Sequence, residues 1–391
     1  MNKHDQSEKD QTVNSQPVEN TPASADNFVV HTSQEIDALG RATANGKTFN
    51  GYQSNAQGGT VTFSLEQLAH SVQLSLDDDE RIAGVDVSYL ENLVRAQDSD
   101  AVIAQLYILS VLAPPAPVSG NFLPKSWIDI DDVIEKIGWD ARSTEQRMEM
   151  RSRIWEFIKY GARAKIVGQR SIPYVDRKTG ETIDTAIFDT AWHLGAPQGP
   201  EQRTLGFIPE IPVRIELILS TGLTALITSP LTAQYLPLGE VLGSIPGGKA
   251  AGAWARVLGL ALASFWRRNP VKSLNGEIKP SRIELLDHYP AKVSPYQEVF
   301  QTNKHGRVIE HWVGAMNILK SCGIIAAEGE ALRTEQDIRS SLPPRGWQEK
   351  WLQEKVSILP GAEMREHIEG RIRALPSPPV KRKMGRPRKS R

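Results

Sequence analysis

The chain has 391 residues, which is enough for two domains with additional tails. It holds 46 basic and 46 acidic residues, but seven of the basic and none of the acidic ones lie in 377–391, which leaves 39 basic against 46 acidic residues in the rest. The single cysteine, Cys322, excludes an intramolecular disulfide and a cysteine-based zinc site, and no apolar run reaches the ~20 residues that cross a bilayer. We therefore expect a cytoplasmic protein with an acidic body, a basic end and no membrane partner.

The first hundred residues divide into two parts. Residues 1–40 are rich in Ser, Asn, Gln, Asp and Glu, which predicts a disordered acidic and polar N-terminal tail. Apolar residues follow at helical spacing over 63–76 and 87–96, so we expect 41–100 to form a helical extension. Nothing in this part indicates a function.

Residues 101–200 have the element order of a winged helix. The apolar run 101–112 predicts a buried helix that ends before a group of prolines, and 127–138 predicts a short amphipathic helix that ends at a glycine. Ser143 has the spacing of a helix cap and opens a long helix to about residue 160. These three helices are the ones that precede the wing in this fold.

A hairpin follows the long helix. The runs 164–175 and 182–188 favour β-strands, and the turn between them contains Gly180, which can adopt the left-handed conformation that a tight turn requires. We expect this hairpin to be the wing of the first unit, with Arg177 and Lys178 at its tip. These two residues are candidates for contact with phosphates, although a solvated turn explains them equally well.

The long helix of the first unit presents an acidic face. Its most solvated arc holds Glu145, Glu149, Ser152, Arg153 and Glu156. Carboxylates only accept hydrogen bonds, and they repel a polyanion such as DNA. We therefore expect the first unit to serve in packing or dimerisation rather than in reading bases.

Residues 201–252 are expected to be a linker that joins two units. Their glycine-rich stretch 243–249 has the glycine and lysine spacing of a phosphate-binding loop, but Ala250 stands where a hydroxyl must ligate Mg²⁺. An ATP-dependent motor or loader is therefore kept only as a third hypothesis, and ATP binding that is lost in Lys249→Ala would support it.

The winged-helix order returns in 253–345. An apolar helix over 254–268 precedes a capping box at Ser281, a long helix over 303–321, and a short β-like run over 322–326 that would begin a second hairpin. The predicted fold is thus mainly α with small β-hairpins, an α+β arrangement of tandem winged-helix domains with disordered N- and C-terminal tails.

The long helix of the second unit divides into two faces when its residues are placed at about 100° per position. The apolar face holds Val308, Ile309, Trp312, Val313, Ala315, Met316 and Leu319. The polar face holds Lys304, Arg307, Glu310, His311, Gly314 and Asn317.

Four residues of this polar face are candidates for DNA binding. Arg307 has the donors for paired hydrogen bonds to guanine, Asn317 has the groups that pair with adenine, and Lys304 at the helix start suits a phosphate. His311 lies on the same face. Because any surface helix has a polar face, a solvated surface without function is the alternative interpretation.

Two further helices, in 346–375, precede a basic tail over 376–391. Within the tail Pro387 keeps Arg386 extended and Gly385 adds no bulk, so this segment can lie in the narrow minor groove of A·T-rich DNA. The candidate residues of the tail are Lys381, Arg382, Lys383, Gly385, Arg386, Pro387, Arg388 and Lys389. This segment resembles the AT-hook at its Gly-Arg-Pro core and at both basic flanks. A solvated basic tail, or an import signal in a eukaryotic host, would explain the same residues.

No catalytic pattern is present. No two of the eight histidines have the spacing of the metal motif in rolling-circle nicking enzymes, and His305 and His311 have no third ligand nearby. The sequence therefore predicts a protein that is not an enzyme and that needs no cofactor and no metal.

With its tandem units, the chain over 100–345 resembles the replication initiators of theta-replicating plasmids. The stretches 227–230 and 235–239, followed by the helix within 253–268, are similar to the junction and first helix of the second winged domain in that family. The resemblance implies a bacterial, DNA-associated protein. Its second unit would bind repeated origin sites in double-stranded DNA, and its first unit would form a homodimer or contact host replication proteins. The disordered N-terminus and the hook-like tail depart from the family. A transcriptional regulator or partition protein of the same architecture is the alternative.

Overall fold

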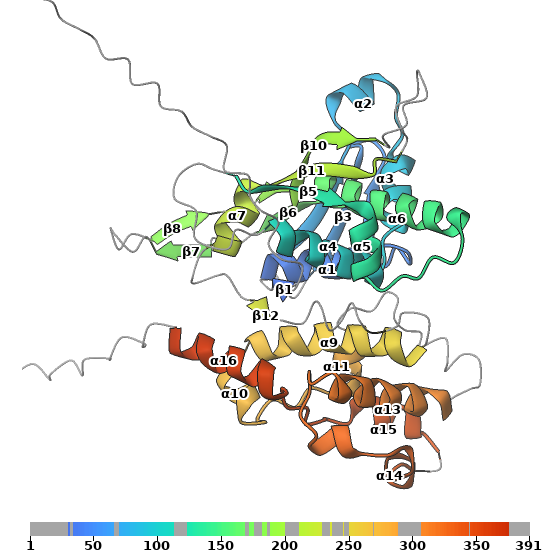
Figure 1. Ribbon diagram of the computed structural model, residues 1–391, viewed down its shortest axis with the longest axis vertical. Helices are drawn as coiled ribbons and strands as arrows, with labels where there is room; N and C mark the ends of the chain where they lie inside the picture. The colour runs from blue at the N-terminus through green and yellow to red at the C-terminus, as the bar shows by residue number, and fades with distance from the viewer. Residues whose placement is uncertain are drawn as a thin grey trace, which may run out of the picture.

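The computed structural model describes residues 30–31, 34–65, 70–112, 123–168, 172–175, 182–185, 188–199, 211–228, 235–236, 245, 250–268, 270–287, 306–343 and 345–374. These residues form two bodies, one made of helices and antiparallel sheets and one made of helices (Figure 1). Helices with small antiparallel sheets are the mixed α and β fold that the sequence predicts. No helix among the described residues is long and apolar enough to cross a membrane.

The N-terminal part of the first body contains a five-stranded antiparallel sheet in the order β2-β3-β4-β6-β9. Its elements are α1 (Gln34–Asn45), β2 (Tyr52–Asn55), β3 (Thr60–Leu65), β4 (His70–Ser75), α2 (Asp78–Ile82), α3 (Val87–Arg95), β6 (Lys165–Gly168) and β9 (Phe188–Asp189). Helix α3 confirms the helix predicted over 87–96. Helix α1 begins inside the range that was predicted to be disordered, so that range is too long.

The prediction of a helix over 63–76 is wrong, because these residues form strands β3 and β4. The side chains of Val61 and Phe63 are buried while Thr62 between them is not, and Val72 and Leu74 repeat this alternation in β4. Burial at every second residue is the signature of a half-buried strand. The helical extension predicted over 41–100 is therefore a mixture of helices and strands.

The first winged unit follows with the helices in the predicted order. Its elements are α4 (Ser99–Leu112), β5 (Lys125–Asp129), α5 (Ile130–Lys136), α6 (Thr144–Arg163), β10 (Trp192–Gln198) and β11 (Arg214–Leu219), and its strands form a sheet in the order β10-β11-β5. The side chain of Asp129 accepts a hydrogen bond at the start of α5, and that of Ser143 does so at the start of α6. These caps satisfy backbone donors that would otherwise lack partners in the first turn.

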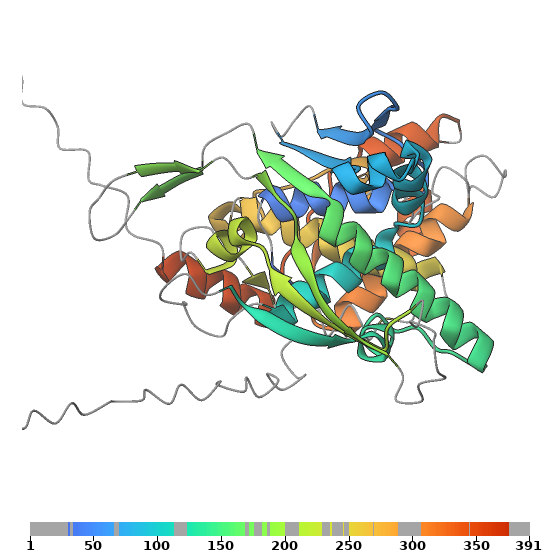
Figure 2. The same ribbon diagram turned by 90° about the horizontal axis from the view of Figure 1, so that it is seen from above.

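The wing of this unit is not the predicted hairpin. Strands β7 (Ile172–Val175) and β8 (Thr182–Thr185) do pair with each other as expected, but they form a separate sheet that projects from the body in both views (Figures 1 and 2). The strand that pairs with β5 is β11, and β11 pairs in turn with β10. Strand β11 and helix α7 (Thr221–Thr228) lie in 201–252, so the prediction of a linker there is wrong for these residues.

The second body contains the second unit. Its helices are α9 (Ala250–Arg268), α10 (Pro270–Leu274), α11 (Arg282–Leu286), α13 (Gly306–Ser321), η1 (Gly329–Leu332), α14 (Glu335–Ser340), α15 (Trp347–Gln353) and α16 (Ala362–Ala374). In place of the second predicted hairpin, the described residues form two isolated antiparallel bridges, Ser281 with Lys355 and Ile325 with Pro360.

The two units nevertheless share one pattern of pairing. In the first unit Asp129, the cap of α5, pairs with Arg214, and the backbone N–H of Ile130 donates to the carbonyl of Val213 at 3.0 Å. In the second unit Ser281, the cap of α11, pairs with Lys355, and the N–H of Arg282 donates to the carbonyl of Glu354 at 3.3 Å. In each unit the capping residue of the second helix thus pairs with a later residue of the same unit in antiparallel fashion.

The two bodies meet along α9. Strand β1 (Val30–His31) pairs with β12 (Tyr235–Leu236) in an antiparallel manner. The hydroxyl of Ser264 on α9 donates to Asp37 Oδ2 of α1 at 2.8 Å, and Arg256 of α9 lies 3.6 Å from the carboxylate of Asp100 on α4. Buried polar contacts therefore join α9 to the first body.

Candidate nucleic-acid interface

Helix α13 follows α11 in the second unit, and its apolar face is close to the predicted one. The buried side chains are Val308, Ile309, Trp312, Ala315, Met316 and Leu319. Val313, which was placed on the same face, is only partly buried. The indole N–H of Trp312 donates to Glu330 at 2.9 Å, so the polar atom of this buried ring has a partner.

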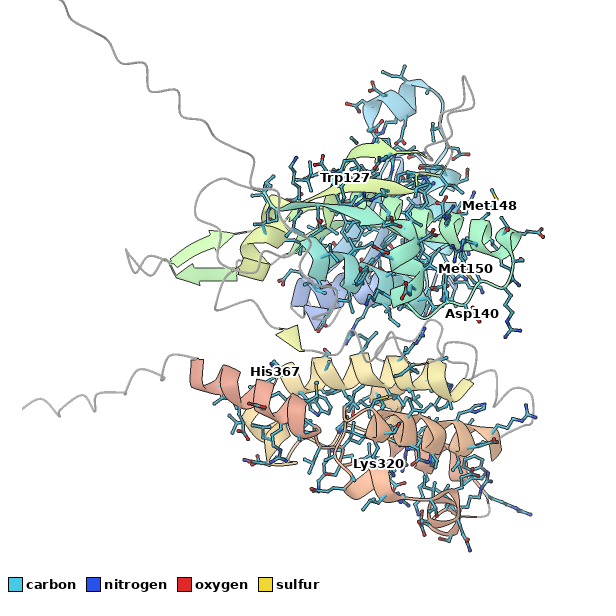
Figure 3. All side chains as sticks on the ribbon, viewed as in Figure 1. Trp127, Asp140, Met148, Met150, Lys320 and His367 are labelled. Atoms are coloured by element: carbon cyan, nitrogen blue, oxygen red, sulfur yellow. The ribbon has the colours of Figure 1, made fainter. Side chains whose placement is uncertain are left out.

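The solvent side of α13 is lined by Arg307, Glu310 and Asn317, which are all exposed. Within the described part of the chain, Arg307 and Asn317 make no hydrogen bond and no ion pair. Their side-chain hydrogen-bonding groups therefore have no partner among the residues that the structure describes. Lys320, in the last turn, instead donates to the carbonyl of Ala331 at 3.3 Å (Figure 3).

Two residues of the predicted polar face lie against α9 instead. The ring of His311 is 5.8 Å from the ring of Trp254, and burial lowers the pKa of His311. A Cβ atom on Gly314 would lie only 2.9 Å from the Cβ of Ala251. The prediction that both residues face outwards is wrong, because the N-terminal part of α9 covers this side of α13.

The corresponding helix of the first unit, α6, has its basic residues engaged within the chain. Arg151 donates to both carboxylate oxygens of Asp131, and Arg163 does the same to Glu80. The remaining pairs are Arg147 with Asp131 at 3.9 Å, Arg153 with Asp98 at 2.5 Å, and Lys159 with Glu156 at 2.6 Å. Every lysine and arginine of α6 thus has a carboxylate partner.

These ion pairs change the protonation of their acidic partners. The hydrogen bonds from Arg151 hold the pKa of Asp131 below its usual range, and those from Arg163 do so for Glu80. The carboxylates therefore stay charged and neutralise the arginines at neutral pH. On the solvent side of α6, Glu145, Glu149 and the apolar Met148 remain exposed (Figure 3).

One feature beside α13 was not found by sequence reasoning. Arg339 of α14 donates to the carbonyl of Gly306, the first residue of α13, at 2.9 Å. The sequence signal for this feature was the capping box of Thr334 and Asp337, which marks the start of α14. Arg339 lies five positions after Thr334 on the same helix.

Several predicted contact residues lie outside the described residues. They are Lys304, Arg177, Lys178 and the tail candidates Lys381, Arg382, Lys383, Gly385, Arg386, Pro387, Arg388 and Lys389. In the glycine-rich stretch 243–249 only Ile245 is described. Its side chain is buried, and its carbonyl accepts a hydrogen bond from Arg256. Among the described residues, no group of three or more His, Cys, Asp or Glu side chains could hold a metal ion.

No family model and no curated protein matches the chain. A crystal structure of selenomethionine derivatives of domain 2 and domain 3 of RctB is similar to 71% of this chain and 86% of that chain, at 11% sequence identity and a TM-score of 0.34. A score this low does not establish a shared fold.

Proposed function

We propose that this protein is a non-catalytic, sequence-specific DNA-binding protein that reads its site through α13 of the second winged unit. The observation that carries the proposal is the contrast between the two equivalent helices. On α6 each basic side chain is paired with a carboxylate, whereas on α13 the exposed Arg307 and Asn317 have no such partner among the described residues. The second unit therefore has free donors where a winged helix meets DNA.

The chemistry of the two free residues suits the major groove. Arg307 can donate two hydrogen bonds to guanine O6 and N7, and Asn317 can pair with adenine N6 and N7. They are ten positions apart, which corresponds to about 15 Å along a helix axis or about four base pairs of duplex. His311 is not among the proposed contacts, because it packs against Trp254.

We further propose that the site is a repeated one, of the kind that a replication initiator binds, in a bacterial cytoplasm. This step is supported by the tandem units and by the likeness of 100–345 to plasmid initiators. The basic residues of 376–391 would raise the affinity for any duplex, because a tethered second contact acts at a high effective concentration.

The first unit would then serve a protein contact, either with a second copy of this chain or with a host replication protein. Its reading helix is neutralised, and it exposes apolar side chains, with Trp127 on β5 41% exposed and Met148 on α6 59% exposed. Exposed aromatic and methionine side chains are frequent at protein interfaces.

Selection of bound duplexes from a random pool tests the proposal, with the full chain and with a chain that ends at Leu375. A repeated motif recovered by both chains supports a specific reader in the winged units. If only A·T-rich duplexes are recovered, and if they disappear on truncation, the tail is the binder and the proposal fails. A plasmid-maintenance assay and a reporter under the protein's own promoter then separate an initiator from a transcriptional regulator.

A further inference from the structure

In the second unit, a helical segment, called the excursion below, stands where the first unit has its wing. In the first unit the chain leaves the sheet after Gln198 in β10 and returns at Arg214 in β11. In the second unit the corresponding bridges are at Ile325 and Lys355. Residues 326–354, which contain η1, α14 and α15, therefore take the place of the wing (Figure 1).

This excursion is fastened to the second unit by a buried charged network. Arg282, at the start of α11, is fully buried and donates to Glu330 of η1 at 2.6 Å, to Glu354 at 2.7 Å and to the backbone carbonyl of Trp351 at 3.0 Å. Arg333 donates to Glu354 at 3.0 Å. Arg282 of α11 thus contacts residues on both sides of α14, and these contacts hold the segment that contains α14 in place.

The excursion lies along the proposed reading helix. Near its beginning, the carbonyl of Ala331 accepts a hydrogen bond from Lys320 in the last turn of α13. Further on, Arg339 of α14 contacts Gly306 in the first turn of α13. The guanidinium of Arg339 therefore lies at the end of α13 that carries Arg307.

Two exposed arginines mark this segment. The side chain of Arg339 is 48% exposed, and its second partner is Glu335, which lies 3.3 Å away and is itself 42% exposed. Arg345, in the loop after α14, is exposed and makes no hydrogen bond or ion pair with any described residue. Asp337 of α14 is already used as an acceptor in the capping box with Thr334.

We propose that α14 acts together with Arg345 as a helical wing, in which Arg339 and Arg345 bind the phosphates that flank the groove occupied by α13. The inference rests on the proposed function and adds the surface that holds α13 in register on the duplex. Guanidinium groups suit this task, because they donate paired hydrogen bonds to phosphate oxygens. Such contacts raise the affinity for every sequence and carry no base preference.

The test measures the salt dependence of DNA binding by the full chain and its variants, between about 50 and 200 mM salt. The probes are the selected duplex and a random duplex of equal length. For Arg339→Ala and for Arg345→Ala, the slope of log K against log salt should fall by about 1, equally on both duplexes. Arg339→Lys keeps the charge and should keep the slope. Arg142→Ala, which removes an exposed arginine from the first unit, should leave it unchanged.

The outcomes separate this inference from the proposed function. Unchanged slopes in both alanine variants, with the preferred site still lost in Arg307→Ala, would overturn the helical wing and leave the reading helix in place. Unchanged binding in all three variants would remove both. Arg345 is exposed and has no partner among the described residues, so Arg345→Ala should fold as the parent chain does.

Discussion

Arg307 is the residue that distinguishes base reading from general attraction to DNA. If it makes paired bonds to a guanine, Arg307→Ala should weaken binding to the preferred duplex by about 1–3 kcal/mol and relax the preference at one base pair. Binding to random duplexes should change much less. Arg142→Ala removes an exposed arginine from the first unit and should leave binding to both duplexes unchanged. Equal losses on both duplexes in Arg307→Ala would show that this residue contacts only phosphate.

Arg282 is the residue on which the buried network of the second unit depends. Replacing it with methionine would leave Glu330, whose side chain is 4% exposed, without its closest cation. The loss of one partner from a buried ion pair costs about 3–5 kcal/mol, so Arg282→Met should lower the free energy of unfolding by that amount in urea titrations. Adding Glu330→Gln should recover part of the loss, because the uncompensated charge is then gone. A loss below about 1 kcal/mol in the single variant would contradict this account.

Helix α6 and strand β10 are closely packed against each other at Gly161 and Trp192. A Cβ atom on Gly161 of α6 would lie 2.2 Å from the ring of Trp192, which is fully buried and is held by a 3.0 Å hydrogen bond to the carbonyl of Ile158. Gly161→Ala gains about 1 kcal/mol of helix propensity, but overpacking should cost more, with a net loss of about 1–2 kcal/mol in urea unfolding. Ser152→Ala, on the partly exposed side of α6, should be neutral or slightly stabilising. A stabilised Gly161→Ala would show that Trp192 can move.

Elements were predictable where their pattern was local. Capping residues located the starts of α6 and α11, and apolar spacing identified the buried face of α13. The alternation of Ile215, Leu217 and Leu219 in β11 is also a local signal, but its partner β10 contains Gly195 and Pro197 and a shift of register, which hide the strand. The hairpin β7–β8 has the stronger strand pattern, so the sequence alone favours it as the wing.

The candidate site was predictable only in part, because it depends on which elements are neighbours. The 100° spacing places Arg307 and Asn317 outside, and they are exposed. The same spacing places His311 outside, yet α9 covers it, and no pattern within α13 contains that information. The ion pairs of α6 likewise join Arg163 to Glu80 and Arg153 to Asp98, across more than fifty positions in the chain.

At the scale of the whole molecule, the two bodies are joined by a charged contact that is poorly satisfied. Arg256 is 2% exposed and lies 3.6 Å from Asp100, and in the described part of the chain its Nε and Nη1 atoms have no hydrogen-bond partner. Burial raises the pKa of Asp100, while the guanidinium of Arg256 acts in the opposite direction. The indole of Trp139 also donates to this carboxylate, at 3.1 Å. The charge state of Asp100 therefore bears on the stability of the junction.

Removing the guanidinium should make the junction sensitive to pH. In Arg256→Met the pKa of Asp100 should rise further above its unfolded value of about 3.9. The folded state then binds the proton of Asp100 more tightly than the unfolded state does, so removing this proton at higher pH costs the folded state stability. The difference in stability between the variant and the parent protein should be most favourable to the variant at pH values below about 4, and the variant should lose stability relative to the parent as the pH rises towards 7. Urea unfolding at three pH values measures this difference. Adding Asp100→Asn should abolish the pH dependence, because the amide oxygen still accepts from Trp139 and carries no charge. A difference that is the same at every pH would show that the charge state of Asp100 does not respond to Arg256.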